Sequence, residues 1–382
     1  MIEVSVVIPC LNEKETIAAC VTKAQASFKS AGLEGEVIIV DNGSTDGSAG
    51  IAAALGARVI NEAQKGYGSA LRRGIEEAAG KYIVMGDGDD TYDFSKAHEF
   101  VAELKKGYDL VMGSRFNGRI MPGAMTWSHR YLGNPLLSGM LRLFFGGNVS
   151  DSHCGLRAFT KEAYLRMGLH TTGMEFASEM VIHSLKKGLK ITEIPIVYYA
   201  RKGESKLDSL RDAWRHMRFM LLYSPGYLYF VPALALFVPS IILLVKFLFG
   251  PVWIFNHPWD IRSMVFASIT ALLGWQIINL GYCAVVYADS IGLVDSTIVK
   301  KFVRYFNLER LMFIGFAVFL IGLVSIGGIF YIWARKGFGE LNIYEIDTIK
   351  LAIFSLTFLN IGIQLVFTAF LASMFQIKFK TN

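Results

Sequence analysis

The stretch Met85-Gly86-Asp87-Gly88-Asp89-Asp90-Thr91-Tyr92 decides the fold, because it joins an apolar run to a cluster of carboxylates. The run before it, residues 82–85, has the composition of a buried strand. The cluster then lies where a strand leaves the sheet, the edge at which open α/β folds bind their ligands. Asp87 and Asp89 can both approach one hard cation, since Mg²⁺ takes one or two carboxylates together with substrate phosphates. An acidic turn before a helix near Phe94 explains the same residues, because Asp, Gly and Thr favour turns.

Short apolar runs alternate with polar loops and helical segments along the first part of the chain. The runs with strand composition are 4–8, 36–40, 57–60, 82–85, 109–112 and, with Pro195 inside it, the edge-like run 191–198. Regular alternation of strand and helix predicts a doubly wound, mostly parallel α/β sheet. A dinucleotide-binding domain would need a G-x-G-x-x-G turn after the first strand, but residues 9–13 are Pro-Cys-Leu-Asn-Glu. The NAD-binding class is therefore excluded.

Hydrophobic residues are unevenly distributed along the 382-residue chain. Long apolar stretches predict four transmembrane helices, at about 227–249, 264–288, 311–333 and 349–370. The chain then divides into an α/β domain (1–206), a connecting segment (207–225) and a transmembrane domain (226–382). The net charge of +6 is too small to indicate nucleic-acid binding, and it suits a protein that lies against anionic membrane lipid.

The connecting segment has the period of an amphipathic helix over residues 207–224. Its apolar face consists of Leu207, Leu210, Trp214, Met217 and Leu221, and its charged face of Asp208, Arg211, Asp212, Arg215 and Arg218. A basic amphipathic helix directly before membrane spans is typical of a helix in the membrane interface. An ordinary surface helix packed on the α/β domain is the alternative.

Loop charges predict how the spans are oriented. The loop 290–310 carries Lys300, Lys301, Arg304 and Arg310, and the C-terminal tail carries Lys378 and Lys380. The other two loops show no such excess of cations. The positive-inside rule then places the α/β domain, the basic loop and the tail in the cytoplasm. An even number of spans requires the same arrangement.

The ordered set of motifs resembles that of GT-A glycosyltransferases of family 2. Within this family it is similar to polyprenyl-phosphate glycosyltransferases such as dolichol-phosphate mannose and glucose synthases. The segments that carry the resemblance are 8–13, 41–46, 65–68, 87–89, 113–115, Asp151 with Cys154-Gly155, and 201–207. Each motif alone is weak, whereas their order is specific. The membrane spans resemble only the general plan, and Cys154 stands where relatives carry Ser.

The resemblance implies a pocket for a nucleotide-sugar donor. The residues carried over to it are Pro9, Leu11, Glu13, Asp41, Gly66, Asp87, Gly88 and Asp89. Asp41 is expected to hold the base, although capping of a following helix gives a second reason for an Asp there. Asp87 and Asp89 are expected to hold Mg²⁺ or Mn²⁺ with the donor diphosphate. Thr91 stands where the family often has a further oxygen ligand.

The implied acceptor is a polyprenyl or dolichyl phosphate, whose phosphate oxygen is already ionised at neutral pH. Such a nucleophile needs no strong general base, and the chain has no Ser-His-Asp or Cys-His signature. The metal would stabilise the departing diphosphate, and cationic side chains would neutralise the incoming phosphate. In-line displacement would invert the anomeric carbon. We expect Arg115, Arg130, Arg201 and Lys206 to hold the acceptor, and Asp87, Asp89, Arg115 and Arg201 to be catalytic.

Two other functions remain open at this point. A processive membrane polysaccharide synthase would carry Gln-x-x-Arg-Trp before its later spans, and the nearest approach here, residues 212–215, does not match. A non-catalytic membrane scaffold would have no need to keep both Asp87 and Asp89. For the donor, UDP-glucose is favoured by the resemblance of residues 87–92 to glucose synthases, with GDP-mannose second. An oligomer is left open.

Overall fold

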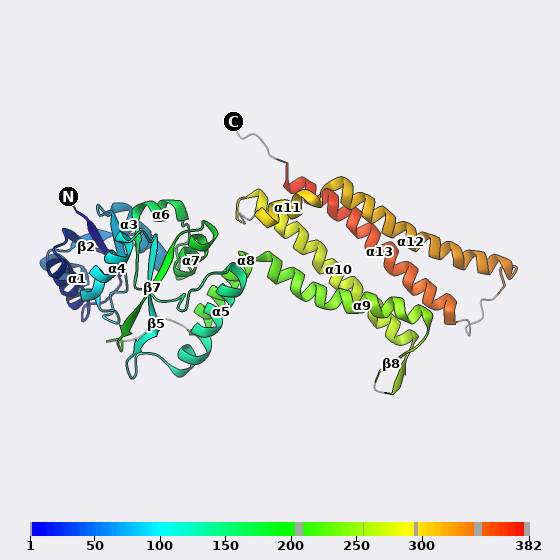
Figure 1. Ribbon diagram of the computed structural model, residues 1–382, viewed down its shortest axis with the longest axis horizontal. Coiled ribbons are helices and arrows are strands. Elements are labelled where there is room, and N and C mark those ends of the chain that lie inside the picture. Colours follow the sequence, from blue (N-terminus) through cyan, green and yellow to red (C-terminus); the bar gives the residue numbers. More distant parts are fainter. Residues whose placement is uncertain (1, 203–208, 255, 294–296, 340–345, 378–382) are drawn as a thin grey trace. The chain divides into compact units, whose positions relative to one another are not determined.

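The structure, a computed structural model, describes residues 2–202, 209–254, 256–293, 297–339 and 346–377 (Figure 1). Its internal contacts divide the chain into two compact units, Met1–Met220 and Leu221–Asn382. The first is an α/β unit and the second a helical unit. The boundary falls within helix α8 (Ser209–Leu222).

The α/β unit is built on a sheet that is parallel except at one strand. Its strands are β1 (Val4–Cys10), β2 (Gly35–Asp41), β3 (Arg58–Asn61), β4 (Tyr82–Met85), β5 (Leu110–Ile120), β6 (Arg157–Thr160) and β7 (Ile191–Tyr198). They are ordered β3-β2-β1-β4-β6-β5-β7. Strand β6 runs antiparallel to both neighbours, and the other pairs are parallel. The predicted doubly wound sheet is confirmed, and β4 lies at its centre.

Helices cover both faces of this sheet, because β1 is apolar on both sides. Val6 and Ile8 pack with Ile17 of α1 in the main core. Val7 points to the other face, where α3 approaches so closely that a Cβ on Gly74 would clash with the Val7 Cγ1. The helices of the unit are α1 (Ile17–Ala31), α2 (Ser48–Ala54), α3 (Tyr67–Glu77), η1 (Phe94–Lys96), α4 (Ala97–Lys105), η2 (His129–Gly133), α5 (Asn134–Phe145), α6 (Lys161–Met167) and α7 (Phe176–Lys186).

Several boundaries differ from the sequence prediction. The strand expected over 109–112 continues to Ile120, because its second half pairs with β7 after an irregularity beyond Ser114. Strand β6 was not predicted, since four residues with a buried arginine among them do not show a strand pattern. Helix α2 begins at Ser48, seven residues after Asp41, so Asp41 does not cap it directly.

Helix α8 packs on the α/β unit through a face other than the predicted apolar stripe. His216 and Met220 are buried, whereas Trp214 is exposed. Ser178 Oγ of α7 lies 2.8 Å from His216 Nδ1, and the His153 ring meets the His216 ring edge to face at 4.6 Å. Trp214 is therefore free to meet another apolar environment. Leu207 and Asp208 lie outside the described residues.

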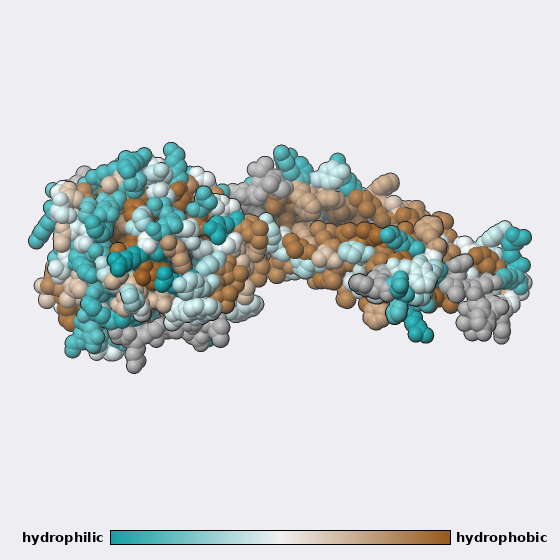
Figure 2. Space-filling model, turned by 60° about the horizontal axis from the view of Figure 1, so that its bottom comes forward, coloured by the Kyte–Doolittle hydropathy of each residue, from teal (hydrophilic) through white to brown (hydrophobic). Residues whose placement is uncertain are grey.

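Within its described residues, the helical unit contains four helices long and apolar enough to cross a membrane, over Gly226–Phe249, Ile261–Ser290, Leu308–Arg335 and Thr348–Phe375. Four transmembrane helices were predicted, and this is confirmed. Figure 2 shows apolar side chains, in brown, over much of the surface of this unit. Its elements are η3 (Gly226–Phe230), α9 (Val231–Phe249), β8 (Val252–Ile254), β9 (His257–Trp259), α10 (Ile261–Ser290), α11 (Thr297–Tyr305), α12 (Leu308–Arg335) and α13 (Ile346–Phe375).

Glycines allow α12 and α13 to pack backbone against backbone. A Cβ on Gly362 would lie 2.5 Å from the amide nitrogen of Phe319, and one on Gly322 would lie 2.7 Å from that of Leu359. Small residues at a helix contact are typical of membrane proteins, where close packing replaces the hydrophobic effect as the attraction between helices.

Candidate active site

The loop after β4 is held against β1 at the centre of the sheet. Thr16 Oγ1 donates a 2.7 Å hydrogen bond to the carbonyl of Gly88. A Cβ on Gly88 would lie only 3.2 Å from the carbonyl oxygen of Pro9. Gly88 thus lets the acidic loop lie on the end of β1, and Asp87 and Asp89 are fixed on either side of it. This places both carboxylates at the carboxyl edge of the parallel strands, as predicted from the sequence.

Asp87 is oriented by a tyrosine that sequence reasoning did not single out. Tyr67 at the start of α3 donates its hydroxyl to Asp87 Oδ1 at 2.9 Å. A side chain on Gly155 would place a Cβ 2.7 Å from Asp87 Oδ2, so this glycine keeps the second oxygen open. Burial, together with the neighbouring Asp89 carboxylate, raises the pKa of Asp87 to about 7, against the lowering effect of the Tyr67 hydrogen bond. The site therefore favours a cation beside Asp87.

Asp89 contacts two of the predicted site residues, Thr91 and Arg201, and Arg201 reaches a third, Glu13. Thr91 Oγ1 donates to Asp89 Oδ1 at 2.6 Å. Arg201 Nη1 lies 3.3 Å from Asp89 Oδ2, and Arg201 Nη2 donates to Glu13 Oε1 at 2.9 Å. The Arg201 Nε is buried and has no hydrogen-bond partner among the described residues. Arg201 thus links the loops after β1, β4 and β7, and keeps one donor unused.

The third aspartate of the loop has a different role. Asp90 adopts a left-handed backbone conformation with φ 58°. Its carboxylate accepts from Lys23 Nζ at 2.6 Å and from Lys202 Nζ at 2.8 Å. These hydrogen bonds hold the pKa of Asp90 below its usual value despite partial burial. Asp90 is neutralised by protein cations and is therefore a poor candidate for a metal ligand.

Arg115 is a buried structural cation in this geometry. Its Nε and Nη2 donate to the two carboxylate oxygens of Asp151, both at 2.7 Å, and its backbone nitrogen donates to Oδ2 at 3.0 Å. Only 6% of Arg115 and none of Asp151 is exposed. The guanidinium also lies over the Tyr198 ring, 5.2 Å from its centroid. The expectation that Arg115 binds the acceptor phosphate does not fit these contacts, because the fork of the guanidinium is already used.

The loops expected to form the nucleotide pocket are tied to one another. Asp41 is buried and accepts from the Ser44 amide at 3.0 Å, so it shapes the turn after β2. Asn42 Oδ1 accepts from the Gly66 amide at 2.8 Å, which connects this turn to the start of α3. Leu11 is exposed. The turn function of Asp41 is thus seen directly, and its contact with a base stays a prediction.

Two predicted phosphate ligands are not brought to the acidic loop by described contacts. Arg130 lies in η2, exposed, with its guanidinium 5.4 Å from the centroid of the adjacent Tyr131 ring. Lys206 lies outside the described residues. The cations that do meet the acidic loop are Arg201, Lys202 and Lys23, of which the sequence indicated only the first.

An exposed apolar stripe on η2 and α5 was also missed. Leu132, Leu136 and Leu143 are each more than half exposed, and Trp127 and Tyr131 lie exposed just before them. Their spacing of four and seven residues puts the leucines on one helical face. The spacing is visible in the sequence, but it lies in a region without clear helix boundaries. Arg130 belongs to the same segment.

The carboxylate oxygens of the acidic loop fit one divalent cation. Asp87 Oδ1 and Asp89 Oδ1 accept hydrogen bonds from the hydroxyls of Tyr67 and Thr91. The Oδ2 atom of Asp87 faces the metal position, and a metal at Asp89 Oδ2 would share that oxygen with Arg201 Nη1, 3.3 Å away. The space beside Asp87 Oδ2 exists only because residue 155 is glycine. Among the described residues, no group of three or more His, Cys, Asp or Glu side chains could hold a metal. Two carboxylates suffice for Mg²⁺ or Mn²⁺ when substrate phosphates and water complete the shell.

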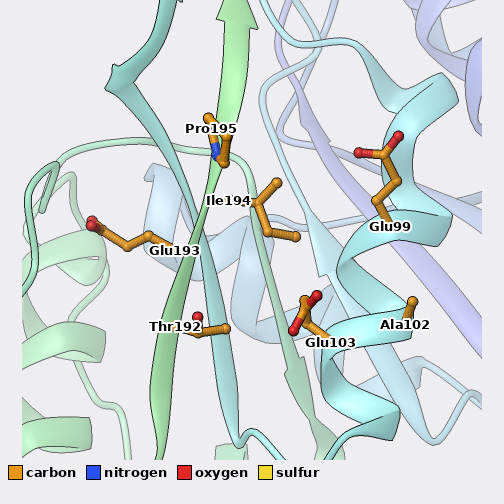
Figure 3. A pocket seen from close by; sticks show the side chains of 7 residues that line it. All are labelled: Glu99, Ala102, Glu103, Thr192, Glu193, Ile194 and Pro195. Atoms are coloured by element: carbon orange, nitrogen blue, oxygen red, sulfur yellow. The ribbon is translucent and has the colours of Figure 1, made fainter.

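A separate cleft between α4 and β7 contains none of the predicted site residues (Figure 3). Its lining is acidic, but each carboxylate has a partner. Glu99 pairs with Lys96, and Glu103 with Lys106. Glu193 accepts from the backbone amides of residues 150 and 151. This cleft is therefore a solvated side of the sheet and contributes nothing to the site.

Known proteins with similar sequences identify the family. A hexosyltransferase of low-salt glycan biosynthesis, Agl6 of Haloferax volcanii, is 38% identical over 96% of this chain and 87% of its own length. The chain belongs to glycosyltransferase family 2. The model of this family, Glycosyl transferase family 2, matches residues 5–168, and a model of the family's C-terminal transmembrane region matches residues 282–376. The fold is accordingly of the GT-A type, and the protein is an integral membrane glycosyltransferase.

Other glycosyltransferases match about half of this chain. A dolichyl-phosphate hexose transferase of Haloferax volcanii is 34% identical over 45% of this chain and 74% of its own length. Among solved structures, glucosyl-3-phosphoglycerate synthase of Mycobacterium tuberculosis is 26% identical with a TM-score of 0.48, and the match covers 58% of this chain and 78% of that one. That crystal contains Mn²⁺, UDP-glucose and phosphoglyceric acid.

Proposed function

We propose that this glycosyltransferase moves a hexose from a nucleotide sugar, UDP-glucose or GDP-mannose, to a polyprenyl or dolichyl phosphate, with inversion at the anomeric carbon. The observation that carries the proposal is the position of Arg201. Its guanidinium contacts Asp89 and Glu13 and still has a buried Nε without a partner among the described residues. A phosphate oxygen is the natural acceptor for that unused donor.

The donor diphosphate would bind at the acidic loop. Asp87 Oδ2 and Asp89 Oδ2 would hold Mg²⁺ or Mn²⁺, and the metal would stabilise the charge that develops on the leaving diphosphate. Tyr67 and Thr91 keep the two carboxylates in place through their hydroxyls. Pro9 and Asp41 lie at the carboxyl ends of β1 and β2, and Leu11 and Gly66 lie in the adjoining loops, so we assign the nucleoside to these four residues.

The acceptor phosphate would approach from the side of Arg201. A phosphate monoester is ionised at neutral pH, so the reaction needs charge neutralisation and alignment but no strong base. The described part of the site fits this, because it presents cations and carboxylates without a histidine in contact with Asp87 or Asp89. We retain Arg201 as the acceptor ligand and give Arg115 the role of holding Asp151.

Exposed apolar residues support a lipid acceptor. Leu132, Leu136 and Leu143 form a stripe on the α/β unit, and Trp214 of α8 is also exposed. Leucine stripes with tryptophan and arginine beside them favour the boundary between headgroups and acyl chains. A lipid phosphate stays near that boundary, so an enzyme that uses it benefits from a catalytic unit held there. A named relative also uses dolichyl phosphate.

We further propose that the α/β unit faces the cytoplasm. The supporting observation is the excess of exposed cations at α11 and the start of α12, where Lys301, Arg304 and Arg310 lie on the connection between the second and third spans. A single cysteine introduced at Lys301 should react with a membrane-impermeant maleimide only after cells are opened. Labelling in intact cells would reverse the orientation.

The function is tested with purified full-length protein in detergent micelles. A panel of radiolabelled nucleotide sugars is incubated with polyprenyl phosphate and Mg²⁺, and the product is extracted into organic solvent. One donor should give a single labelled lipid that releases one hexose on mild acid treatment, and NMR of the intact lipid should show an anomeric configuration opposite to that of the donor. Label that stays in a polymer would identify a processive synthase, and the absence of lipid product with every donor would contradict the proposal.

A further inference from the structure

Polar side chains connect α10 and α13 inside the helical unit. Ser268 Oγ and Thr357 Oγ1 are 2.7 Å apart, and Trp275 Nε1 donates to the carbonyl of Ile361 at 3.2 Å. The partners advance together along both helices, so α10 and α13 run side by side in the same direction (Figure 1). These polar groups between α10 and α13, which we call the seam, form hydrogen bonds with one another. They therefore offer no donor to a partner outside the helix pair.

An amide chain leads from the seam to the surface of α13. Asn279 Nδ2 donates to Gln364 Oε1 at 3.5 Å, and Gln364 Nε2 donates to Asn360 Oδ1 at 2.6 Å. Asn360 is exposed, and no partner for its Nδ2 group is found among the described residues. The chain of hydrogen bonds therefore ends at an exposed amide, whose Nδ2 group has two N–H donors to offer.

Asn360 lies where hydrocarbon would surround it. It occupies the middle of α13, on a stripe with the exposed residues Leu356, Ile363 and Phe367. Helix α10 shows the same pattern near its own middle, with the exposed residues Ile269, Leu273, Gln276 and Leu280. Both stripes are apolar except for one central amide, and both helices are long and apolar enough to cross the membrane.

A central amide in such a stripe needs a partner, because hydrocarbon offers no hydrogen bond to it. The stripe of α13 holds no cation, so a lipid phosphate has nothing to bind there. A primary amide carries both donors and an acceptor, and therefore it complements another copy of itself. Two identical chains related by a twofold axis bring the same residue face to face.

We propose that a second copy of this chain packs on the exposed stripe of α13 and forms an amide–amide hydrogen bond through Asn360. Gln276 on α10 adds a second polar contact of the same kind. The leucine, isoleucine and phenylalanine side chains of the stripe supply the close packing around the amide, which is the usual source of attraction between helices in lipid. This contact requires neither nucleotide sugar nor acceptor.

The experiment measures energy transfer between donor-labelled and acceptor-labelled full-length protein in phosphatidylcholine vesicles, over a range of protein-to-lipid ratios. The wild type should associate, and Asn360→Leu should weaken association by roughly tenfold, the usual size of one interhelical polar contact. Asn360→Gln should restore it. The matched control is Ser325→Leu on α12, whose hydroxyl donates to the carbonyl of Ile321 in its own helix at 2.8 Å, and which should leave association unchanged.

Three results would overturn the proposal. The wild type could give no energy transfer at the highest protein-to-lipid ratio. Asn360→Leu could associate as tightly as the wild type. Asn360→Leu could also remain associated and lose binding of added polyprenyl phosphate, which would show that the Asn360 amide binds a lipid and not a second copy of the chain. Circular dichroism of each variant confirms that the helices are intact.

Discussion

Arg201 forms an ion pair with Asp89, with Nη1 3.3 Å from Oδ2, although the two residues lie at the ends of different strands. The same guanidinium reaches Glu13 after β1. One cation thus joins the carboxyl ends of β1, β4 and β7 and makes a single site of three loops. The chemistry we propose depends on this junction, because it places a phosphate-binding group beside the carboxylates that would hold the metal.

Replacing Arg201 tests its role toward the acceptor. Arg201→Gln should lower kcat/KM for polyprenyl phosphate by about 10- to 100-fold, since a hydrogen bond to a charged group contributes roughly 1.5–3 kcal/mol. Binding of the nucleotide sugar should change less. Initial rates at varied acceptor concentration in detergent give the values, and Arg119→Gln, an exposed arginine of β5, serves as control. Unchanged acceptor kinetics in Arg201→Gln would show that Arg201 does not bind the acceptor phosphate.

Arg115 should behave as a structural residue. Arg115→Ala leaves the fully buried Asp151 carboxylate without its partner, and breaking a buried ion pair in this way costs about 3–5 kcal/mol of unfolding free energy. Denaturant unfolding of the α/β unit within the full chain measures the loss, with Arg119→Ala as control. A stable Arg115→Ala protein that has lost only acceptor binding would contradict this structural role and show that Arg115 binds the acceptor.

Local sequence patterns predict where most site residues lie in the fold. They do not predict which distant residues those side chains contact. The pattern of residues 82–92 placed Asp87 and Asp89 correctly, because a strand followed by a turn is a local feature. Arg115 also follows a strand, but its partner Asp151 lies 36 residues away along the chain. Tyr67 meets Asp87 only when α3 packs on the sheet. Strand β6 likewise depends on pairing with distant β4 and β5.

Tyr67 should control metal binding through Asp87. Removing its hydroxyl in Tyr67→Phe takes away a hydrogen bond that lowers the pKa of Asp87, so this pKa should rise. The metal needs the ionised carboxylate, and therefore its affinity should rise with pH and level off above about pH 7 in the wild type. In Tyr67→Phe the curve should move to higher pH, with roughly tenfold weaker binding at pH 7.

Mn²⁺ titration followed by electron paramagnetic resonance at several pH values measures this curve. Tyr82→Phe, a change at a buried tyrosine of β4, is the control. If Tyr67→Phe gives the wild-type curve, the hydroxyl does not tune Asp87.

Acidification should release α8 from the α/β unit. Burial, followed by the positive charges of Arg157 and Arg215, lowers the pKa of His216 to about 4. A base with a lowered pKa stabilises the fold fully above its unfolded value of 6.5, and the contribution is lost as the pH falls toward 4. The loss should reach about 3 kcal/mol, from 1.36 kcal/mol per pKa unit.

Trp214 lies on the same helix, so its fluorescence reports the release in a variant whose other five tryptophans are replaced by phenylalanine. His216→Gln should reduce the dependence of unfolding on pH between 6.5 and 4, while the exposed His257→Gln should not. An identical acid profile in His216→Gln and the wild type would show that α8 is not held through this imidazole.

The central claim is that Asp87 and Asp89 hold the divalent metal used for hexose transfer to a lipid phosphate. The most direct measurement is the initial rate of labelled lipid formation by purified full-length protein, with Mg²⁺ or with EDTA. Asp89→Asn should lower the Mg²⁺-dependent rate by orders of magnitude and stay folded. Asp93→Asn should keep the rate, because Asp93 only caps η1 through Ser95. Full activity of Asp89→Asn in EDTA would contradict the account.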